Sequence, residues 1–327
     1  MTVVLGESVR PKVSVCITAY NHVNYISQAL DGVLAQQTDF AFEILVGEDG
    51  SADGTREIVQ EYANQHPKIM RPFFNDRSNV IYINGNPSGR WNLVNLIEHA
   101  RGEYVALLDG DDYWTDPQKL QLQADLLDSH HDCSFAFHNA MELDENTGRL
   151  QPFRGLALEG EAPQRIRDSG HGQVSEVGLQ DLFFTWMVPT ASIMFRNSML
   201  EPFPEWYFRA ISGDHMLQLL LARNGKALYL NRCMSVYRKH AGGVTLRHSS
   251  ATVRRNWARM HYVFNRFFNY EYDHLLAGRL ARDLQPPFSR FIARYLRALK
   301  ISARGGIRPL LLLHWALIQR IHRRAGL

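Results

Sequence analysis

Short apolar segments of strand type alternate with segments of helical type over residues 13–108. The run VSVCITAY at 13–20 is rich in β-branched residues, and apolar residues then recur at helical spacing as far as Leu34. The same reasoning predicts further strands at 42–48, 69–74 and 104–108, and helices around 58–62 and at 90–99. Such short alternation indicates an α/β fold with a mainly parallel, doubly wound sheet that helices cover on both faces.

The second part of the chain has a mixed pattern. It predicts a helix at 214–223 and strands at 134–142, 191–196 and 227–230. After about residue 248 the pattern becomes helical and rich in arginine. We therefore expect one domain over residues 1–247, whose part from 113 to 247 is mixed, followed by a C-terminal helical extension over 248–327.

The cysteines and the hydropathy indicate a cytoplasmic protein. Cys16, Cys133 and Cys233 are far apart and odd in number, so neither a disulfide framework nor a zinc site is indicated. The N-terminus lacks the apolar segment of a secretion signal, and no stretch reaches the roughly 18 uncharged residues of a membrane span.

Three aspartates follow the predicted strand at 104–108. Asp109, Asp111 and Asp112 lie on one turn, and carboxylates this close repel one another unless a cation lies among them. Oxygen ligands in this pattern suit Mg²⁺ or Mn²⁺. The alternative is a solvated acidic turn before the helix that begins near Asp116 and Pro117.

Polar residues also follow the first two predicted strands. Thr18, Tyr20 and Asn21 end the first strand, and Glu48 and Asp49 end the second. Ligands of open α/β sheets bind beyond the carboxyl ends of the strands, so these residues and the aspartates are expected at one site. The alternatives are an ordinary Asp-Gly-Ser turn at Asp49 and ordinary packing for Thr18 and Tyr20.

Five segments, taken together and in order, resemble the family 2 glycosyltransferases of the GT-A fold: VSVCITAYNHVNYISQALDGVLAQ, FEILVGEDGSADGT, NLVNLIEHARGEYVALLDGDDYW, SGDHMLQLLLARNG and YRKHAGG. The resemblance covers about residues 12–243. It implies transfer of a sugar from a nucleotide donor, with inversion at the anomeric carbon. It also implies a GT-A catalytic domain at 1–247, with a nucleotide-sugar half at 12–112 and an acceptor and base half at 113–247.

The resemblance also implies roles on the donor side. Asp49 would accept a hydrogen bond from the uracil imide, with UDP-sugars favoured, although the family usually has Asp where this chain has Glu48. The diphosphate and a divalent cation, Mn²⁺ or Mg²⁺, would lie at Asp109, Asp111 and Asp112, and the cation would bind Asp111, Asp112 and His240. The other nucleotide-binding residues would be Thr18, Tyr20, Asn21, Arg90 and Asn95.

On the acceptor side, the resemblance makes Asp214 the catalytic base. The acceptor hydroxyl must lose a proton as it attacks, and a carboxylate within hydrogen-bond reach can take it. The alternative for Asp214 is a helix N-cap, which Asp fills readily. Trp186 is the candidate acceptor residue, because an aromatic face suits a sugar ring, and its alternative is a place in the core.

Two other functions compete with this interpretation. A nucleotidyltransferase would ordinarily show a Gly-rich, basic phosphate loop after the first strand, and TAYNHVNY has none. The second competing function is that of a non-catalytic member of the fold that only binds a sugar nucleotide. The presence together of four aspartates argues against it: Asp49, Asp111, Asp112 and Asp214.

The C-terminal extension is strongly basic. Residues 285–327 contain nine of the 36 Lys and Arg residues and none of the 33 Asp and Glu residues. Their apolar residues form two amphipathic helical stripes separated by Gly305 and Gly306. This pattern predicts an anchor on an anionic membrane surface, which suits a glycan or lipid-linked acceptor better than nucleic acid. The alternative is that both stripes pack on the catalytic domain.

Overall fold

The computed structural model of the protein describes residues 10–83, 85–153, 166, 168–184, 188–243 and 260–276. The chain divides into two compact units, Met1–Arg247 and His248–Leu327. Trp186 and the basic segment 285–327 lie outside the described residues.

Four parallel strands form the first half of the first unit. They are β1 (Val13–Ala19), β2 (Phe42–Glu48), β3 (Met70–Phe74) and β6 (Tyr104–Asp109). Every residue of β2 is buried, because helices cover both faces of the sheet at this point. The predicted α/β fold with a parallel sheet is therefore confirmed.

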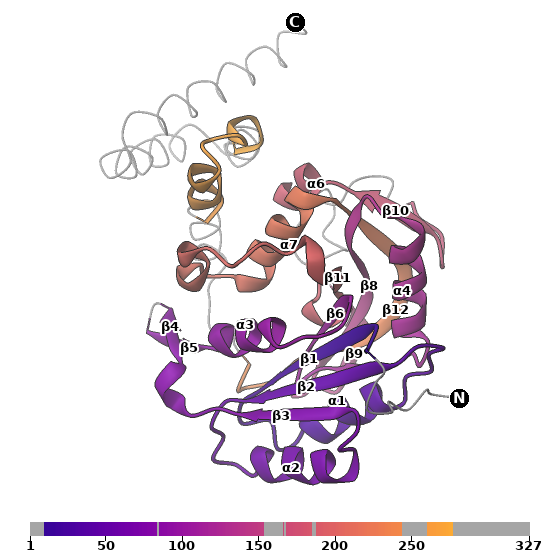
Figure 1. Ribbon diagram of the computed structural model, residues 1–327, viewed down its shortest axis with the longest axis vertical. Coiled ribbons are helices and arrows are strands. Elements are labelled where there is room, and N and C mark those ends of the chain that lie inside the picture. The colour runs from indigo at the N-terminus through magenta and orange to yellow at the C-terminus, as the bar shows by residue number, and fades with distance from the viewer. Residues whose placement is uncertain are drawn as a thin grey trace, which may run out of the picture. The chain divides into compact units, whose positions relative to one another are not determined.

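Three helices cover these strands: α1 (Ile26–Leu34), α2 (Thr55–Gln65) and α3 (Arg90–Glu98). Figure 1 shows α1 and α2 on one side of the sheet and α3 on the other. The apolar stripe of α1 packs into the core against alternate residues of β1 and β2. Leu30 and Val33 of α1, for example, are completely buried.

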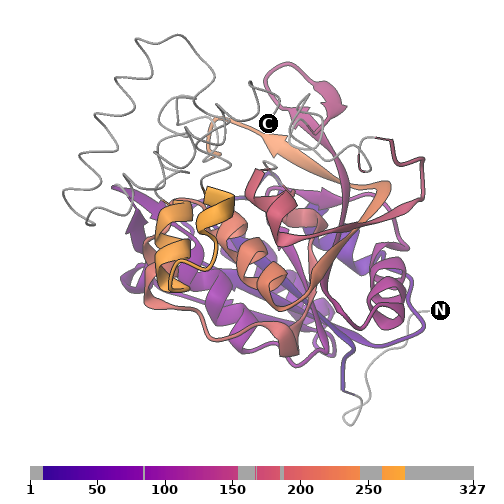
Figure 2. The same ribbon diagram turned by 90° about the horizontal axis from the view of Figure 1, so that it is seen from above.

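The second half of the unit adds mixed strands to the same sheet. They are β8 (Cys133–Asp144), β10 (Val174–Val177), β11 (Met194–Arg196) and β12 (Lys226–Lys239). β11 runs antiparallel to β6 and to β8, whereas β8 and β12 are parallel to each other. Figure 2 shows the long strands β8 and β12 side by side. The sheet order is β10-β12-β8-β11-β6-β1-β2-β3.

Strand β12 is much longer than the four residues predicted at 227–230. It continues to Lys239 through register shifts between Leu230 and Cys233 and between Cys233 and Ser235. The polar residues at these bulges interrupt the hydrophobic pattern, so the sequence marks only the first part of the strand.

The remaining described elements are smaller or lie outside the sheet. Helices α4 (Lys119–Ser129), α6 (Leu179–Phe184) and α7 (Gly213–Asn224) belong to the second half. Strand β7 (Tyr113–Trp114) pairs with β12, and β9 (Arg149–Pro152) pairs with β8. A separate hairpin and four short 3₁₀ helices complete the set: β4 (Ile81–Ile83), β5 (Asn86–Ser88), η1 (Arg77–Asn79), η2 (Thr190–Ser192), η3 (Asn197–Met199) and η4 (Glu205–Arg209).

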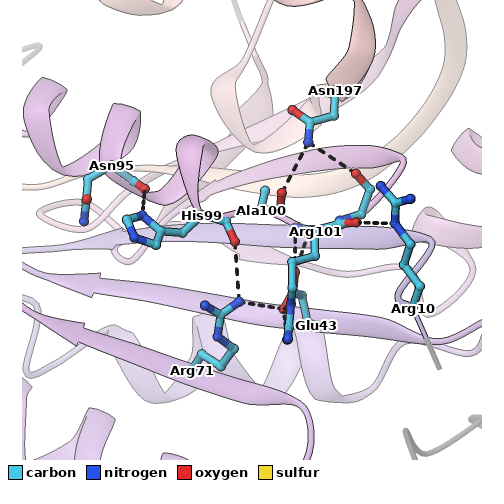
Figure 3. A network of polar contacts seen from close by, with 10 residues as sticks. Arg10, Glu43, Arg71, Asn95, His99, Ala100, Arg101 and Asn197 are labelled. Carbon is cyan, nitrogen blue, oxygen red and sulfur yellow. Dashed lines mark hydrogen bonds and ion pairs between the residues drawn. The ribbon is translucent and has the colours of Figure 1, made fainter. Parts of the chain in front are cut away.

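A buried carboxylate joins the strands at their amino-terminal edge (Figure 3). Glu43 is completely buried, and its Oε1 accepts from Ser14 Oγ at 2.7 Å and from the Arg101 backbone N–H at 2.9 Å. Its Oε2 accepts from Arg71 Nη1 at 3.0 Å and from Arg101 Nε and Nη2 at 3.0 and 2.6 Å. These four residues, called the Glu43 network below, connect β1, β2, β3 and the turn before β6.

The described part of the second unit is residues 260–276. It is helical at 260–267 and again at 273–276. Asn265 fixes the turn between these segments, because its side chain donates to Asp273 Oδ1 at 2.7 Å and accepts from the Tyr272 backbone N–H at 2.8 Å. Across all the described ranges, none of the helices has the length and apolar character needed to cross a membrane.

Candidate active site

The predicted site residues of β1 and β6 meet at the carboxyl ends of these strands. Thr18 is paired with Asp109 in the sheet, and its Oγ1 donates to Asp109 Oδ1 at 2.7 Å. The following Gly110 donates its N–H to the Thr18 carbonyl at 2.8 Å. A Cβ at Gly110 would lie 3.0 Å from that carbonyl oxygen and from Ile26, so glycine lets the acidic turn lie against β1.

The other two aspartates of the turn contact the end of β12. The Arg238 backbone N–H donates to Asp112 Oδ1 at 2.8 Å, and His240 Nε2 lies 3.0 Å from Asp111 Oδ2. His240 also packs on the Tyr25 ring, with 4.7 Å between the ring centroids. The structure therefore brings Asp111 and His240 together, whereas the Asp112 side chain is held by the backbone of β12.

The three carboxylates differ in charge. Burial and the charges of Asp111 and Asp214 raise the pKa of Asp109 to about 7. Burial and the same turn's other two aspartates raise the pKa of Asp112. Burial also acts to raise the pKa of Asp111, but the hydrogen bond to His240 and the nearby His22 outweigh it and leave that pKa lowered. Asp111 is therefore the member of the turn whose environment favours the charged form.

His22 is a site residue that the sequence analysis missed. It follows Asn21 on the loop after β1, and its Nε2 lies 3.7 Å from Asp111 Oδ2. Burial lowers its pKa, although Asp111 opposes this effect. Its position directly after the TAYN segment was the available signal, but a single histidine on a loop could not be told apart from the other 13.

The side chains around the acidic turn offer a divalent cation only part of its ligands. In the part of the chain that the structure describes, no three His, Cys, Asp or Glu side chains converge as a complete metal-ligand set. Asp111 and His240 still supply one carboxylate oxygen and one imidazole nitrogen, which Mn²⁺ accepts. The residues thus fit a cation that takes its other ligands from a bound diphosphate and water.

Arg238 positions the acidic turn. Its Nη1 donates to the Asp111 carbonyl at 2.8 Å, and its Nε lies 2.8 Å from Glu145 Oε1. Its guanidinium also lies over the rings of Tyr113 and Tyr25, at 4.5 and 5.0 Å from the centroids. With these contacts Arg238 is buried, so it holds the turn in place instead of facing a phosphate.

Asp49 and Tyr20 form the second part of the site, at the ends of β2 and β1. Asp49 is buried, and its backbone N–H donates to the Ala19 carbonyl at 2.9 Å. Burial raises the pKa of Asp49 to about 6, although Arg77 opposes this and Glu48 adds to it. The Tyr20 ring is partly exposed, and the Arg77 guanidinium lies over it at 3.9 Å from the centroid.

Asn21 and Glu48 support the loops around Asp49. Asn21 has a positive φ of 55°, donates its backbone N–H to Ser51 Oγ at 2.9 Å and accepts from the Ala52 N–H at 3.2 Å. Glu48 is completely buried and accepts from the Ser51 N–H at 2.6 Å and from Arg56 Nε at 2.5 Å. Glu48 therefore stabilises the turn that follows β2, which leaves Asp49 as the candidate binding carboxylate of this pair.

Arg90 and Asn95 do not join these residues. Arg90 Nη1 is buried and donates to the carbonyls of Tyr207, at 2.8 Å, and of Ala210. The carbonyl of Asn95 accepts from the His99 ring at 2.8 Å, beside the Glu43 network (Figure 3). It is Asn92 that faces the sheet, since this side chain is buried and donates to the Gly47 carbonyl at 2.7 Å.

Asp214 lies in the first turn of α7. The alternative that it is the N-cap is wrong, because Ser212 is the N-cap and its Oγ accepts from the His215 N–H at 3.4 Å. The Asp214 side chain is exposed, and its charge is one of the causes that raise the pKa of Asp109, after burial and Asp111. Arg90 fills the space beside Gly213, where a Cβ would come within 2.7 Å of its Nε. A side chain at position 213 would therefore displace the Arg90 guanidinium, which packs against the start of α7.

The sequence was also matched by a model of a known family over its first part. The family model of glycosyl transferase family 2 matches residues 14–174. This match places residues 14–174 of the chain in glycosyl transferase family 2. An uncharacterized protein of Mycobacterium tuberculosis is 30% identical over 244 residues, an alignment that covers 75% of this chain and 63% of the relative.

Two solved structures share the fold of this chain. S. aureus TarS 1–349 in complex with UDP-GlcNAc superposes with a TM-score of 0.54 at 20% identity, covering 96% of this chain and 92% of TarS. Mannosyltransferase PcManGT from Pyrobaculum calidifontis, in complex with GDP-Man and Mn²⁺, superposes with a TM-score of 0.50 at 15% identity, covering 96% and 88%. The fold is therefore of the GT-A type.

Proposed function

We propose that this chain transfers a sugar from a nucleoside diphosphate donor, with UDP-sugars favoured, to an acceptor hydroxyl with inversion at the anomeric carbon. The observation that carries the proposal is the meeting of the acidic turn, His240 and the charge of Asp214 at one edge of the sheet. Asp49 and Tyr20 lie at the same edge and offer a carboxylate and an aromatic face to a base.

In this reaction the acceptor oxygen forms a bond to the anomeric carbon while the bond from that carbon to the diphosphate breaks. The electron pair of the broken bond leaves with the diphosphate. Asp214 takes the proton of the acceptor hydroxyl, for which an exposed carboxylate near Asp109 is suited. Thr18 and Arg238 fix the acidic turn, so that the site does not rearrange as charge develops.

Asp111 and His240 would hold the divalent cation, with Asp112 as the second carboxylate of that site. A bound Mn²⁺ or Mg²⁺ would stabilise the negative charge of the leaving diphosphate. Burial and, after it, repulsion between neighbouring carboxylates raise the pKa values of Asp109 and Asp112, and a cation would relieve the repulsion.

For the acceptor, we propose a hydroxyl of a saccharide, a lipid-linked sugar or a cell-surface glycan. The basic segment 285–327 would place the enzyme on the cytoplasmic face of an anionic membrane, where such acceptors are made. Vesicles that contain anionic lipid should sediment the full chain in a salt-sensitive way. A chain that lacks residues 285–327 should stay in solution, and a full chain that ignores the vesicles would remove the membrane role.

A panel of nucleotides tests the catalytic proposal. UDP-, GDP-, dTDP- and CDP-sugars would be screened with the full chain for thermal stabilisation and for nucleotide release, with Mn²⁺ and with EDTA. We expect one donor to give Mn²⁺-dependent stabilisation and slow release of its nucleoside diphosphate. Thermal stabilisation by a donor without release of its nucleoside diphosphate, whatever acceptor is added, would indicate a non-catalytic member of the fold. Release of pyrophosphate from a nucleoside triphosphate would indicate a nucleotidyltransferase.

A further inference from the structure

Arg77 covers the part of the site that faces a base. It comes from η1, whose first turn Asp76 caps by accepting from the Ser78 N–H at 2.8 Å. Its aliphatic stem packs on Gly50, where a Cβ would lie 3.1 Å from the Arg77 Cγ. The backbone and the stem are therefore fixed, and the guanidinium is placed between two groups of the site.

The first of these groups is the Tyr20 ring, and the second is Asp49. The guanidinium carbon lies 3.9 Å from the centroid of Tyr20, which is a stacking distance. Nη1 donates to the Asp49 carbonyl at 3.2 Å and lies 3.5 Å from Asp49 Oδ2. Only 7% of the Asp49 side chain is exposed, and Arg77 is its ion-pair partner.

A nucleobase, like a guanidinium, is a planar group with N–H donors on its edge, so both can bind the same two residues. The ring of uracil or guanine can stack on a tyrosine and donate an N–H to a carboxylate. A guanidinium is a flat cation that does both. Arg77 thus stacks on Tyr20 and forms an ion pair with Asp49, so it occupies both groups that the proposed function assigns to the base of the donor.

We propose that Arg77 competes with the nucleobase for Tyr20 and Asp49, and thereby sets how tightly the chain binds its nucleotide donor. The inference rests on the proposed function. The Arg77 side chain is 32% exposed, so its guanidinium can rotate into solvent while η1 keeps its Asp76 cap.

Such competition has a specific thermodynamic signature. When only a fraction of the protein has an open pocket, the apparent dissociation constant of every ligand is raised by the same factor. Removing Arg77 should therefore tighten all nucleotides equally and leave their ratio unchanged. An arginine that contacts the bound base would do the opposite, because its loss would weaken binding and change the preference between bases.

The test is calorimetric titration of the full chain with UDP and with GDP in Mn²⁺. We expect Arg77→Ala to lower both dissociation constants roughly tenfold, the size of effect that a stacked and ion-paired arginine supports, with an unchanged UDP to GDP ratio. Arg77→Lys keeps the charge but loses the flat face, and it should shift both constants in the same direction by a smaller factor.

Arg71→Ala is the matched control. Arg71 also lies over an aromatic ring, Phe73 at 5.6 Å, and also meets a buried carboxylate, Glu43 at 3.0 Å, but at the opposite edge of the sheet. The Arg71→Ala variant should leave the dissociation constants for UDP and GDP unchanged. Weaker or equal binding by Arg77→Ala, or a changed ratio, overturns the competition. If wild type and Arg77→Ala bind neither nucleotide, the proposed function itself fails.

Discussion

Replacing Glu43 by glutamine tests what holds the amino-terminal edge of the sheet. The Oε1 of Glu43 accepts from Ser14 and the Arg101 backbone, and a glutamine oxygen can keep these two bonds. The Oε2 accepts from three guanidinium N–H groups of Arg71 and Arg101. In Glu43→Gln an NH₂ group faces those donors, so all three lose their acceptor.

The expected loss of stability follows from burial. Breaking a buried ion pair by removing one partner costs about 3–5 kcal/mol. Here the Arg71 and Arg101 side chains are 36% and 57% exposed and can be rehydrated, which places the loss near the lower end, at about 3 kcal/mol. Urea unfolding followed by circular dichroism should show a lower midpoint with an unchanged slope.

The same network predicts a dependence on pH. Burial acts to raise the pKa of Glu43, but its hydrogen bonds with Arg101, Ser14 and Arg71 outweigh it and leave the pKa lowered. A lowered carboxyl pKa contributes stability above the ordinary Glu pKa, and this stability is lost as the pH falls through the folded-state value. Glu43→Gln should therefore show a flatter decline of stability in acid.

Glu103→Gln is the control for this prediction. Its side chain is 57% exposed and lies 3.8 Å from Arg196, so its loss should change the stability by less than about 0.5 kcal/mol. Equal free energies of unfolding for Glu43→Gln and Glu103→Gln would refute the claim that the Glu43 network stabilises this edge of the sheet.

Three further predictions concern the site. Asp111→Asn should abolish Mn²⁺-dependent donor binding in a thermal-shift assay without unfolding the protein, and donor affinity that is the same in EDTA would contradict this. Asp214→Asn should bind the donor normally but transfer sugar roughly 10²–10⁴-fold more slowly, and a wild-type rate would exclude it as the base. The affinity for UDP should fall as the pH decreases through about 6, because protonated Asp49 no longer accepts an N–H from the base. Asp49→Asn should remove this pH step, and persistence of the step in that variant would assign it to another group.

The sequence predicted the parallel half of the fold well, because each strand and helix there carries its own periodic pattern. Residues 104–108, for example, are apolar in the sequence and buried in β6. The position of the acidic turn could be predicted for the same reason, since parallel strands bring their carboxyl ends to one edge of the sheet.

The parts that were missed depend on contacts between distant segments. His22 approaches Asp111 only because the loop after β1 folds over the acidic turn. Arg90 has the sequence position of a site residue, but carbonyls of the 207–210 segment, far along the chain, take up its donors. The hairpin of β4 and β5 consists of strands of three residues, which are too short to show an alternation.

The continuity of α7 and β12 has a consequence for exchanging parts between relatives. Asp214 lies in the first turn of helix α7, and Gly225 alone connects this helix to β12. A Cβ at Gly225 would come within 2.7 Å of the Asp132 carbonyl. The same uninterrupted segment then ends at His240. One segment therefore delivers both the proposed base and a proposed cation ligand, and the bulges of β12 set where the second arrives. A chimera should keep its register only when this whole segment comes from a single parent.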